Sequence, residues 1–278
     1  MTPLLEVDDL RVAFPGHGFR ARPTEVLHGV SLTVATGETL GLVGESGSGK
    51  TTIGRAVLGL VKPSGGRIRF DGSDITDLSG AARRALARDI QVVFQDPYGS
   101  LNPSLTIGDI LSEPLVVQGV TPAAARARIT ELLDQVGLPG DAAARLPREF
   151  SGGQRQRVAI ARALAPEPKL IVCDEPVSAL DLSTQARVLD LFIDIQRRTG
   201  VAYLFISHDL AVIRHVSHRV TVLYRGDIVE TGRAPVVTSA PTHPYTQRLL
   251  LAAPVSDPVE QRRRRTERHR LAEQTRTA

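Results

Sequence analysis

A glycine-rich loop between an apolar segment and a helical one limits the folds open to this chain more than any other feature. The loop reads Gly44-Glu45-Ser46-Gly47-Ser48-Gly49-Lys50-Thr51 and follows the short apolar run 39–43. Glycines let backbone N–H groups approach an anion closely, and the helix that follows directs its N-terminus toward the same point. The spacing G-x-x-x-x-G-K-[ST], between a strand and a helix, predicts a site that holds the phosphates of a nucleotide.

The residues of this loop are expected to have different roles. The Lys50 ammonium group is expected to reach the β- and γ-phosphates, and the Thr51 hydroxyl is expected to bind Mg²⁺. The other predicted nucleotide contacts of this segment are Gly44, Glu45, Ser46, Gly47, Ser48, Gly49 and Thr52.

Two carboxylates close a second apolar run. Asp174 and Glu175 directly follow the segment 170–173. In a parallel sheet the end of this strand would lie beside the glycine loop, so one carboxylate can hold the Mg²⁺ shell while the other polarises the attacking water. Two acids at a strand end are also common as solvated residues. They indicate phosphoryl transfer only in combination with the loop.

A second glycine-tipped helix start lies between these two segments. Its residues are Ser151, Gly152, Gly153 and Gln154, and Ser151 is in the position of an N-cap. A start of this kind is ordinary by itself. On a chain that already carries a phosphate loop, it suggests a nucleotide held from two sides.

Strands and helices alternate over most of the chain. Residues 4–34 are predicted to form short antiparallel strands, and the stretch 96–150 becomes helical after Pro103. Further strands are expected at 39–43, 68–70, 90–95, 170–174, 201–206 and 219–224, and helices at 50–60, 152–165, 183–199 and 209–216. The alternation predicts a mainly parallel sheet covered on both faces, with a helical insertion.

Composition excludes several classes of protein. The net charge is +4, and a basic run, Arg262–Arg265, near the end is expected to be a solvated, flexible tail. The single cysteine, Cys173, excludes an intrachain disulfide and a multi-cysteine metal site. The N-terminus lacks a signal-peptide pattern, and no apolar stretch approaches the ~20 residues needed to cross a bilayer. We therefore expect a cytosolic chain that reaches a membrane only through a partner.

Together the three segments resemble the ATP-hydrolysing subunits of ABC transporters. Residues 150–164 match the signature of that family, apart from Phe150, where leucine is commoner. The resemblance covers residues 4–250, expected to be one nucleotide-binding domain. It implies an α/β fold: a P-loop NTPase core with a mainly parallel sheet, an N-terminal antiparallel β subdomain and an inserted α-helical subdomain at about 96–150. It implies ATP and Mg²⁺ as ligands.

The resemblance also implies roles for residues that carry little signal alone. Gln95, after an apolar strand, matches a glutamine that contacts Mg²⁺ and water and senses the transmembrane partner. His208 matches the switch histidine that contacts the γ-phosphate. Phe14 stands where an aromatic residue stacks on adenine, with Phe19 as the second candidate. The expected catalytic residues are Glu175, His208 and Gln95, and the expected metal ligands are Thr51, Gln95 and Asp174.

A finer resemblance indicates a subfamily. Residues 94–103, 113–115 and 241–246 are similar to the oligopeptide/dipeptide permease ATPases, and nickel and glutathione importers share these features. The last of these segments belongs to a C-terminal extension, expected at 235–278. Some members carry a C-terminal cysteine cluster that binds iron–sulfur, which a chain with Cys173 alone cannot form.

The family mechanism implies a dimer of ATPase subunits. In the family each ATP lies between the glycine loop of one subunit and the segment equivalent to Ser151–Gln154 of the other. ATP closes the dimer and switches the permease, and hydrolysis reopens it. The expected partners are a second ATPase subunit, identical or related, transmembrane permease subunits and, indirectly, a solute-binding protein. The expected location is the cytoplasmic face of the cell membrane.

Two other functions compete with this one. A soluble ABC-type ATPase acting on nucleic acid would use the Arg262–Arg265 run, but such proteins usually carry paired ATPase domains, long coiled-coil insertions or zinc cysteines. No nucleic-acid partner is therefore expected. A P-loop small-molecule kinase would leave the signature helix unexplained. The sequence does not name the cargo, which in this subfamily is a peptide, nickel, glutathione or another solute.

Overall fold

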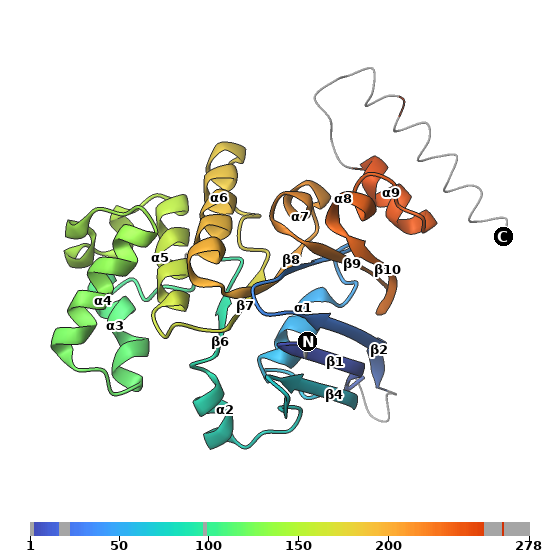
Figure 1. Cartoon of the computed structure of the whole chain (residues 1–278), viewed down its shortest axis with the longest axis horizontal. Coiled ribbons are helices and arrows are strands. Elements are labelled where there is room, and N and C mark those ends of the chain that lie inside the picture. Colours follow the sequence, from blue (N-terminus) through green and yellow to red (C-terminus); the bar gives the residue numbers. More distant parts are fainter. Residues whose placement is uncertain (1–2, 17–22, 97–98, 253–262, 264–278) are drawn as a thin grey trace.

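The chain folds around two sheets (Figure 1). The computed structural model describes residues 3–16, 23–96, 99–252 and 263, so Phe19 and the tail from 253 onward, apart from Arg263, lie outside the described residues. Within this part of the chain no helix is both long and apolar enough to cross a membrane.

The strands are β1 (Leu5–Phe14), β2 (Thr24–Val34), β3 (Thr39–Val43), β4 (Gly65–Phe70), β5 (Ser73–Asp74), β6 (Ile90–Val93), β7 (Leu170–Asp174), β8 (Ala202–Ser207), β9 (Arg219–Tyr224) and β10 (Asp227–Arg233). The helices are α1 (Lys50–Val57), α2 (Gly80–Leu86), α3 (Ile107–Val117), α4 (Pro122–Gln135), α5 (Gly152–Leu164), α6 (Leu182–Thr199), α7 (Leu210–Val216), α8 (Ala234–Val237) and α9 (Pro244–Ala252). The described residues also form two short 3-10 helices, η1 (Gly140–Ala144) and η2 (Pro147–Glu149).

The larger sheet is mainly parallel, as the alternation of strands and helices predicts. Its order is β10-β9-β3-β8-β7-β6, and only β10 runs antiparallel to its neighbour. Strands β3 and β8 are buried along their whole length. Such burial requires cover on both faces and explains why these strands are continuously apolar rather than alternating.

Alternate residues of the central strands enter two separate cores. In β7, Ile171 and Cys173 face the core that holds α5, α6 and α7. Leu170 and Val172 face the other core, which holds α1 and the antiparallel sheet β2-β1-β4-β5. The helices α1 and α5 therefore lie on opposite faces of the larger sheet (Figure 1).

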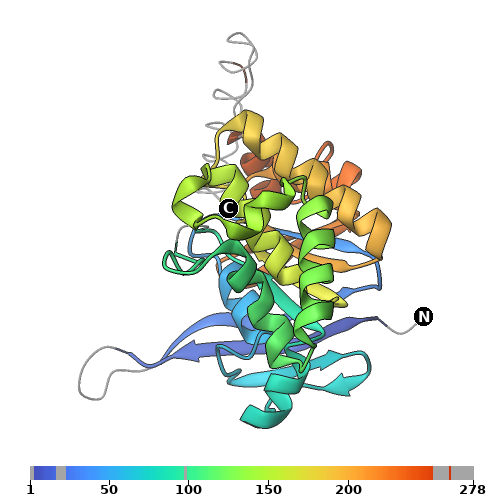
Figure 2. The same cartoon turned by 90° about the vertical axis from the view of Figure 1, so that its left-hand side faces the viewer.

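Helices α3 and α4 form the predicted helical block. They pack against α5 at the β6 end of the larger sheet, through buried side chains such as Ile110 and Leu132. Figure 2 shows the two helices in front of that sheet. Thr106 and Asp109 form a capping box at the start of α3, and Pro122 occupies the first turn of α4, where its missing N–H is not needed. The predicted fold class is confirmed.

The sequence-based prediction was incomplete in two places. Within residues 4–34, β1 and β2 are two long strands instead of several short ones. Their pairing continues past a bulge at Asp9 (φ 45°) in β1 and past a second irregularity at Gly29 (φ 107°) in β2. Helix α2 was not predicted, since none of its residues is buried and it has no apolar face to reveal it.

Candidate nucleotide-binding site

The glycine loop joins the end of β3 to the start of α1, and neighbouring strands enclose its two ends. A Cβ on Gly44 would lie 2.1 Å from the Leu223 carbonyl oxygen, and one on Gly49 (φ 106°) would lie 2.6 Å from a Leu27 methyl group. Both positions therefore require glycine. Gly47, at the middle of the loop, has no atom within 4 Å of a Cβ position, so the backbone is open on that side.

The side chains of the loop favour the binding of an anion. The Lys50 ammonium group is buried and donates hydrogen bonds to the carbonyl oxygens of Gly44 (2.7 Å) and Glu45 (2.9 Å). Burial lowers the pKa of Lys50, while the nearby carboxylates act in the opposite direction. The Ser48 hydroxyl oxygen is buried and has no hydrogen-bond partner among the described residues. The loop thus holds a cation and a buried polar atom that a phosphate would satisfy.

Two of the predicted metal ligands meet at the start of α1. The Thr51 hydroxyl donates a hydrogen bond of 2.9 Å to Asp174 Oδ1 at the end of β7. Burial raises the pKa of Asp174, although the bond from Thr51 acts in the opposite direction. A hydroxyl and a carboxylate oxygen are the hard donors that Mg²⁺ prefers. The third predicted ligand, Gln95, is exposed after β6, and no hydrogen bond joins it to the other two in the described part of the chain.

The predicted catalytic pair also meets. Glu175 Oε2 lies 3.0 Å from His208 Nδ1, because the two residues follow the adjacent parallel strands β7 and β8. The Glu175 backbone has φ 49°, a conformation that costs a non-glycine residue on the order of 1–3 kcal/mol. The Glu175 N–H donates to the Ile206 carbonyl oxygen (3.0 Å), and the Glu175 carbonyl oxygen accepts from the Ser178 hydroxyl (3.1 Å). These bonds hold the strained turn that directs the carboxylate toward the histidine.

The signature segment is well formed but separate from the loop. Ser151 caps α5: its hydroxyl accepts from Gln154 N–H (3.3 Å), and its N–H donates to Gln154 Oε1 (2.9 Å). Gly153 packs so closely on α6 that a Cβ would lie 2.2 Å from Thr184 Cγ2. No hydrogen bond between described residues joins this segment to the glycine loop, and α5 lies on the other face of the sheet from α1. One chain therefore does not bring the two segments together.

The predicted adenine contact lies in the smaller sheet. Phe14 is the last residue of β1, pairs with Thr24 of β2 and is 41% exposed. Its ring makes no aromatic contact with another described residue. An exposed aromatic face is available there for a base to stack upon.

Two contacts to the loop escaped the sequence-based prediction. The Glu45 N–H donates to the Tyr245 hydroxyl (2.9 Å), and the Gly226 N–H donates to the Ser48 carbonyl oxygen (3.0 Å). Tyr245 stands in the segment 241–246, which the sequence indicates only as part of a C-terminal extension. A separation of 200 residues along the chain leaves no local pattern that could reveal the contact.

Comparison with known proteins gives a consistent result. The family profile described as "ABC transporter" matches residues 27–178. Glutathione import ATP-binding protein GsiA of Escherichia coli (strain K12) is 53% identical over 268 residues, which are 95% of this chain and 43% of GsiA. The same protein of Shigella boydii serotype 4 (strain Sb227) has the same identity and coverage. The chain thus spans less than half the length of these curated relatives.

Two solved structures are similar over most of the chain. CbiO1 from Clostridium perfringens, described as part of the ABC transporter complex cbiONQ, matches with a TM-score of 0.77 and 28% identity, covering 86% of this chain and 91% of cbiO1. The ATP-binding cassette MJ0796, in a dimeric post-hydrolysis state with ADP and Pi, matches with a TM-score of 0.73 and 29% identity, covering 83% of this chain and 98% of MJ0796.

Proposed function

This chain belongs to the ABC transporter family, and we propose that it is the ATP-hydrolysing subunit of a membrane importer for peptides. The observation that carries the proposal is the 2.9 Å hydrogen bond between Thr51 and Asp174, which joins the phosphate loop to the acidic strand end. The likeness to GsiA supports the cargo class, because glutathione is itself a small peptide.

The domain organisation follows from the same proposal. Residues 4–250 form the nucleotide-binding domain, in which the helices within about 96–150 are an inserted subdomain. Residues 235–278 form a C-terminal extension that overlaps its end. The packing of α3 and α4 against α5, at one end of the larger sheet, supports the assignment of the insertion.

The residues of the loop fit ATP together with Mg²⁺. The buried, unpartnered Ser48 hydroxyl, the buried Lys50 and the glycine backbone suit phosphate oxygens. Thr51 and Asp174 would hold the metal ion, with Gln95 as a further ligand. When bound, Mg²⁺ would neutralise charge on the phosphates.

Glu175 and His208 act on the γ-phosphate end of the nucleotide. The Glu175 carboxylate orients and polarises the attacking water, while Lys50 supplies positive charge to the phosphates. His208 presents Nδ1 to Glu175 at 3.0 Å, so Nε2 is the ring nitrogen left to contact the γ-phosphate. The contact thereby fixes the position of the Glu175 carboxylate relative to the γ-phosphate.

The active form in this proposal contains two ATPase subunits. The loop and Ser151–Gln154 are not joined within one chain, so the signature segment of the other subunit completes each nucleotide-binding site. The dimeric ADP-bound relative supports this arrangement. The second subunit is a copy of this chain or a related one, and permease subunits hold the pair at the cytoplasmic face of the membrane, where a solute-binding protein acts indirectly.

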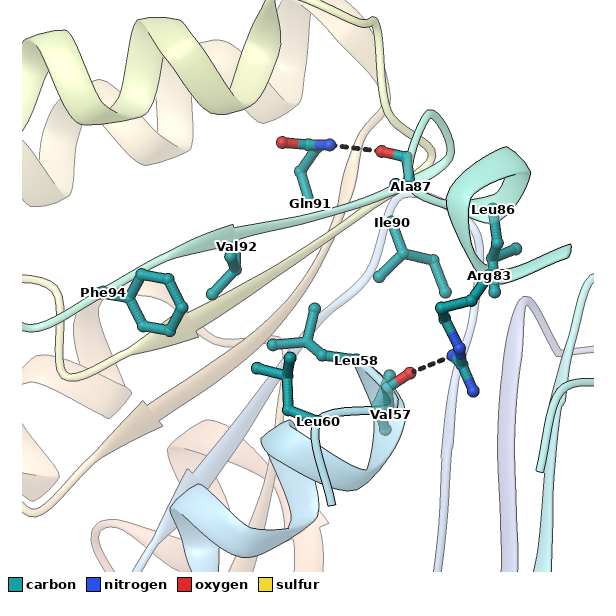
Figure 3. A pocket seen from close by; sticks show the side chains of 10 residues that line it. All are labelled: Val57, Leu58, Leu60, Arg83, Leu86, Ala87, Ile90, Gln91, Val92 and Phe94. Carbon is teal, nitrogen blue, oxygen red and sulfur yellow. Dashed lines mark hydrogen bonds between the residues drawn. The ribbon is translucent and has the colours of Figure 1, made fainter. Parts of the chain in front are cut away.

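An apolar pocket beside Gln95 is the surface that we assign to the permease. Its volume is about 250 Å³, and the side chains of Leu58, Leu60 and Phe94 line it (Figure 3). Leu60 is 62% exposed, and Phe94 directly precedes Gln95, the residue expected to sense the transmembrane partner. Arg83 of α2 closes one side through a hydrogen bond of 3.2 Å to the Val57 carbonyl oxygen (Figure 3).

Exposed apolar side chains next to a ligand-sensing residue are typical of a protein contact. Leu60→Asp is therefore expected to reduce co-purification with the permease. Val236→Asp is the control, because Val236 is similarly exposed on α8, away from the pocket. Equal recovery of the permease with both variants would contradict this assignment.

Phosphate release by the purified chain tests the function as a whole. We expect hydrolysis that requires both ATP and Mg²⁺ and that is lost in Lys50→Ala. Transfer of phosphate to an acceptor other than water would instead indicate a kinase. Salt-dependent binding to DNA, lost when the tail is deleted, would favour the nucleic-acid alternative.

A further inference from the structure

The start of the phosphate loop is held by a residue from the C-terminal helix. The Glu45 N–H donates a 2.9 Å hydrogen bond to the hydroxyl of Tyr245, which lies in α9 and is 2% exposed. The carbonyl group of the same Glu45 accepts from the Lys50 ammonium group at 2.9 Å. The N–H of Glu45 is therefore bound by Tyr245, and its carbonyl oxygen is bound by Lys50, the residue expected to reach the phosphates.

The aromatic ring of Tyr245 is fixed by the sheet. It packs against the ring of Tyr224, with centroids 4.2 Å apart and planes tilted by 35°. Tyr224 is the last residue of β9 and follows Leu223, whose carbonyl oxygen encloses Gly44. Burial raises the pKa of Tyr245, so its hydroxyl remains protonated and neutral at physiological pH.

The start of α9 is anchored independently of the loop. The Glu230 carboxylate of β10 accepts hydrogen bonds from the Thr242 N–H (2.8 Å), the Thr242 hydroxyl (3.0 Å) and the His243 N–H (3.2 Å). Burial acts to raise the pKa of Glu230, but its hydrogen bonds outweigh this and lower it, so the carboxylate stays ionised. Gln247 adds a bond of 3.1 Å from its side chain to the Pro241 carbonyl oxygen.

We propose that Tyr245 is a positioning residue for the phosphate loop, through which the C-terminal helix α9 sets the affinity of the site for nucleotide. The proposal rests on the proposed ATP-binding function. The Tyr245 hydroxyl bonds to the loop backbone: it holds the peptide group between Gly44 and Glu45, and the Gly44 carbonyl oxygen of that peptide accepts from the Lys50 ammonium group at 2.7 Å. Loss of the hydroxyl releases that peptide and leaves Lys50 less well placed for a phosphate.

Tyr245→Phe tests the proposal because it removes only the hydroxyl group. The matched control is Tyr224→Phe, which removes a hydroxyl from the ring stacked against it. For Tyr245→Phe we expect the KM for MgATP to rise about three- to tenfold, the loss corresponding to one hydrogen bond, with kcat changed less than about twofold. Amide hydrogen exchange at Glu45 is expected to become faster in the same variant and to stay unchanged in the control.

If Tyr245 had only a structural role, Tyr245→Phe and Tyr224→Phe would both lower thermal stability. In that case KM would not rise selectively while kcat stayed nearly constant. Glu230→Gln is a second test, since it weakens the anchor of α9 and is expected to raise KM in the same direction. Unchanged KM and unchanged Glu45 exchange in Tyr245→Phe would overturn the proposal. A wild-type chain that does not bind MgATP would instead overturn the proposed function, and Glu45 exchange would still decide whether Tyr245 holds the loop.

Discussion

The Nδ1 atom of His208 lies 3.0 Å from Oε2 of Glu175, although the two residues are 33 positions apart in the sequence. They follow neighbouring parallel strands whose register pairs Asp174 with Ile206. The sheet therefore places a carboxylate and an imidazole in contact at its carboxyl edge, next to the phosphate loop. In the proposed ATPase this pair acts as one unit. Removal of either residue is therefore expected to impair ATP hydrolysis about as much as removal of both.

Replacement of Glu175 by glutamine is expected to separate binding from hydrolysis. Glutamine keeps the size of the side chain but removes the carboxylate that we propose polarises water, so phosphate release should fall by about 10²–10⁴-fold. ATP binding should persist, and an ATP-bound dimer should accumulate. Phosphate release and size-exclusion chromatography measure the two effects. An unimpaired turnover rate in this variant would remove Glu175 from the mechanism.

The pairing of Glu175 with His208 predicts strong non-additivity. His208→Ala alone should lower kcat severely, and adding it to Glu175→Gln should lower kcat little further, because residues that act as a unit are not independent. His215→Ala is the control: His215 contacts Asp190 at 2.8 Å on the surface, away from the loop. Losses that multiply in the double variant would show that the two residues act separately.

A methyl group at Gly44 should damage the loop. Gly44→Ala would place its Cβ 2.1 Å from the Leu223 carbonyl oxygen, and crowding of this kind costs about 1–3 kcal/mol. Nucleotide affinity should fall together with the melting temperature. Gly140→Ala is the matched control, since nothing lies within 4 Å of a Cβ there. Similar thermal stability and affinity in both variants would contradict the geometry of the loop.

The contact between the signature segment and α6 offers a rescue experiment. Gly153→Ala would place its Cβ 2.2 Å from Thr184 Cγ2, so we expect hydrolysis to fall while binding of ATP to the single chain persists. Adding Thr184→Ser removes that methyl group but keeps a hydroxyl able to bond Asp181, as Thr184 does at 2.7 Å. Activity should return in part. No recovery in the double variant would indicate that the methyl contact is not what makes Gly153 necessary.

Much of the site could be predicted because it lies at the ends of strongly apolar strands. Asp174 ends a buried strand, Glu175 and His208 directly follow buried strands, and parallel strands bring such ends to one edge. The position of Tyr245 could not be predicted, because it depends on how α9 folds back over the loop. The antiparallel strands within residues 4–34 are predicted, but β1 and β2 are longer than expected, since the bulge at Asp9 interrupts the alternation that reveals a strand.

Ser151 and the glycine loop of one chain serve different nucleotides in the proposed dimer, and mixing two inactive variants tests this arrangement. Lys50→Ala disables the loop. Ser151→Arg places a bulky side chain at an exposed position of the signature segment and should block the nucleotide of the other subunit.

Each variant alone should hydrolyse almost no ATP. In an equal mixture, half of the dimers pair one variant with the other, and each such dimer has one intact site made from both chains. We therefore expect phosphate release to recover to roughly a quarter of the wild-type rate. A mixture no more active than the two separate variants would contradict the shared sites, because it would mean that copies of this chain do not complete each other's sites.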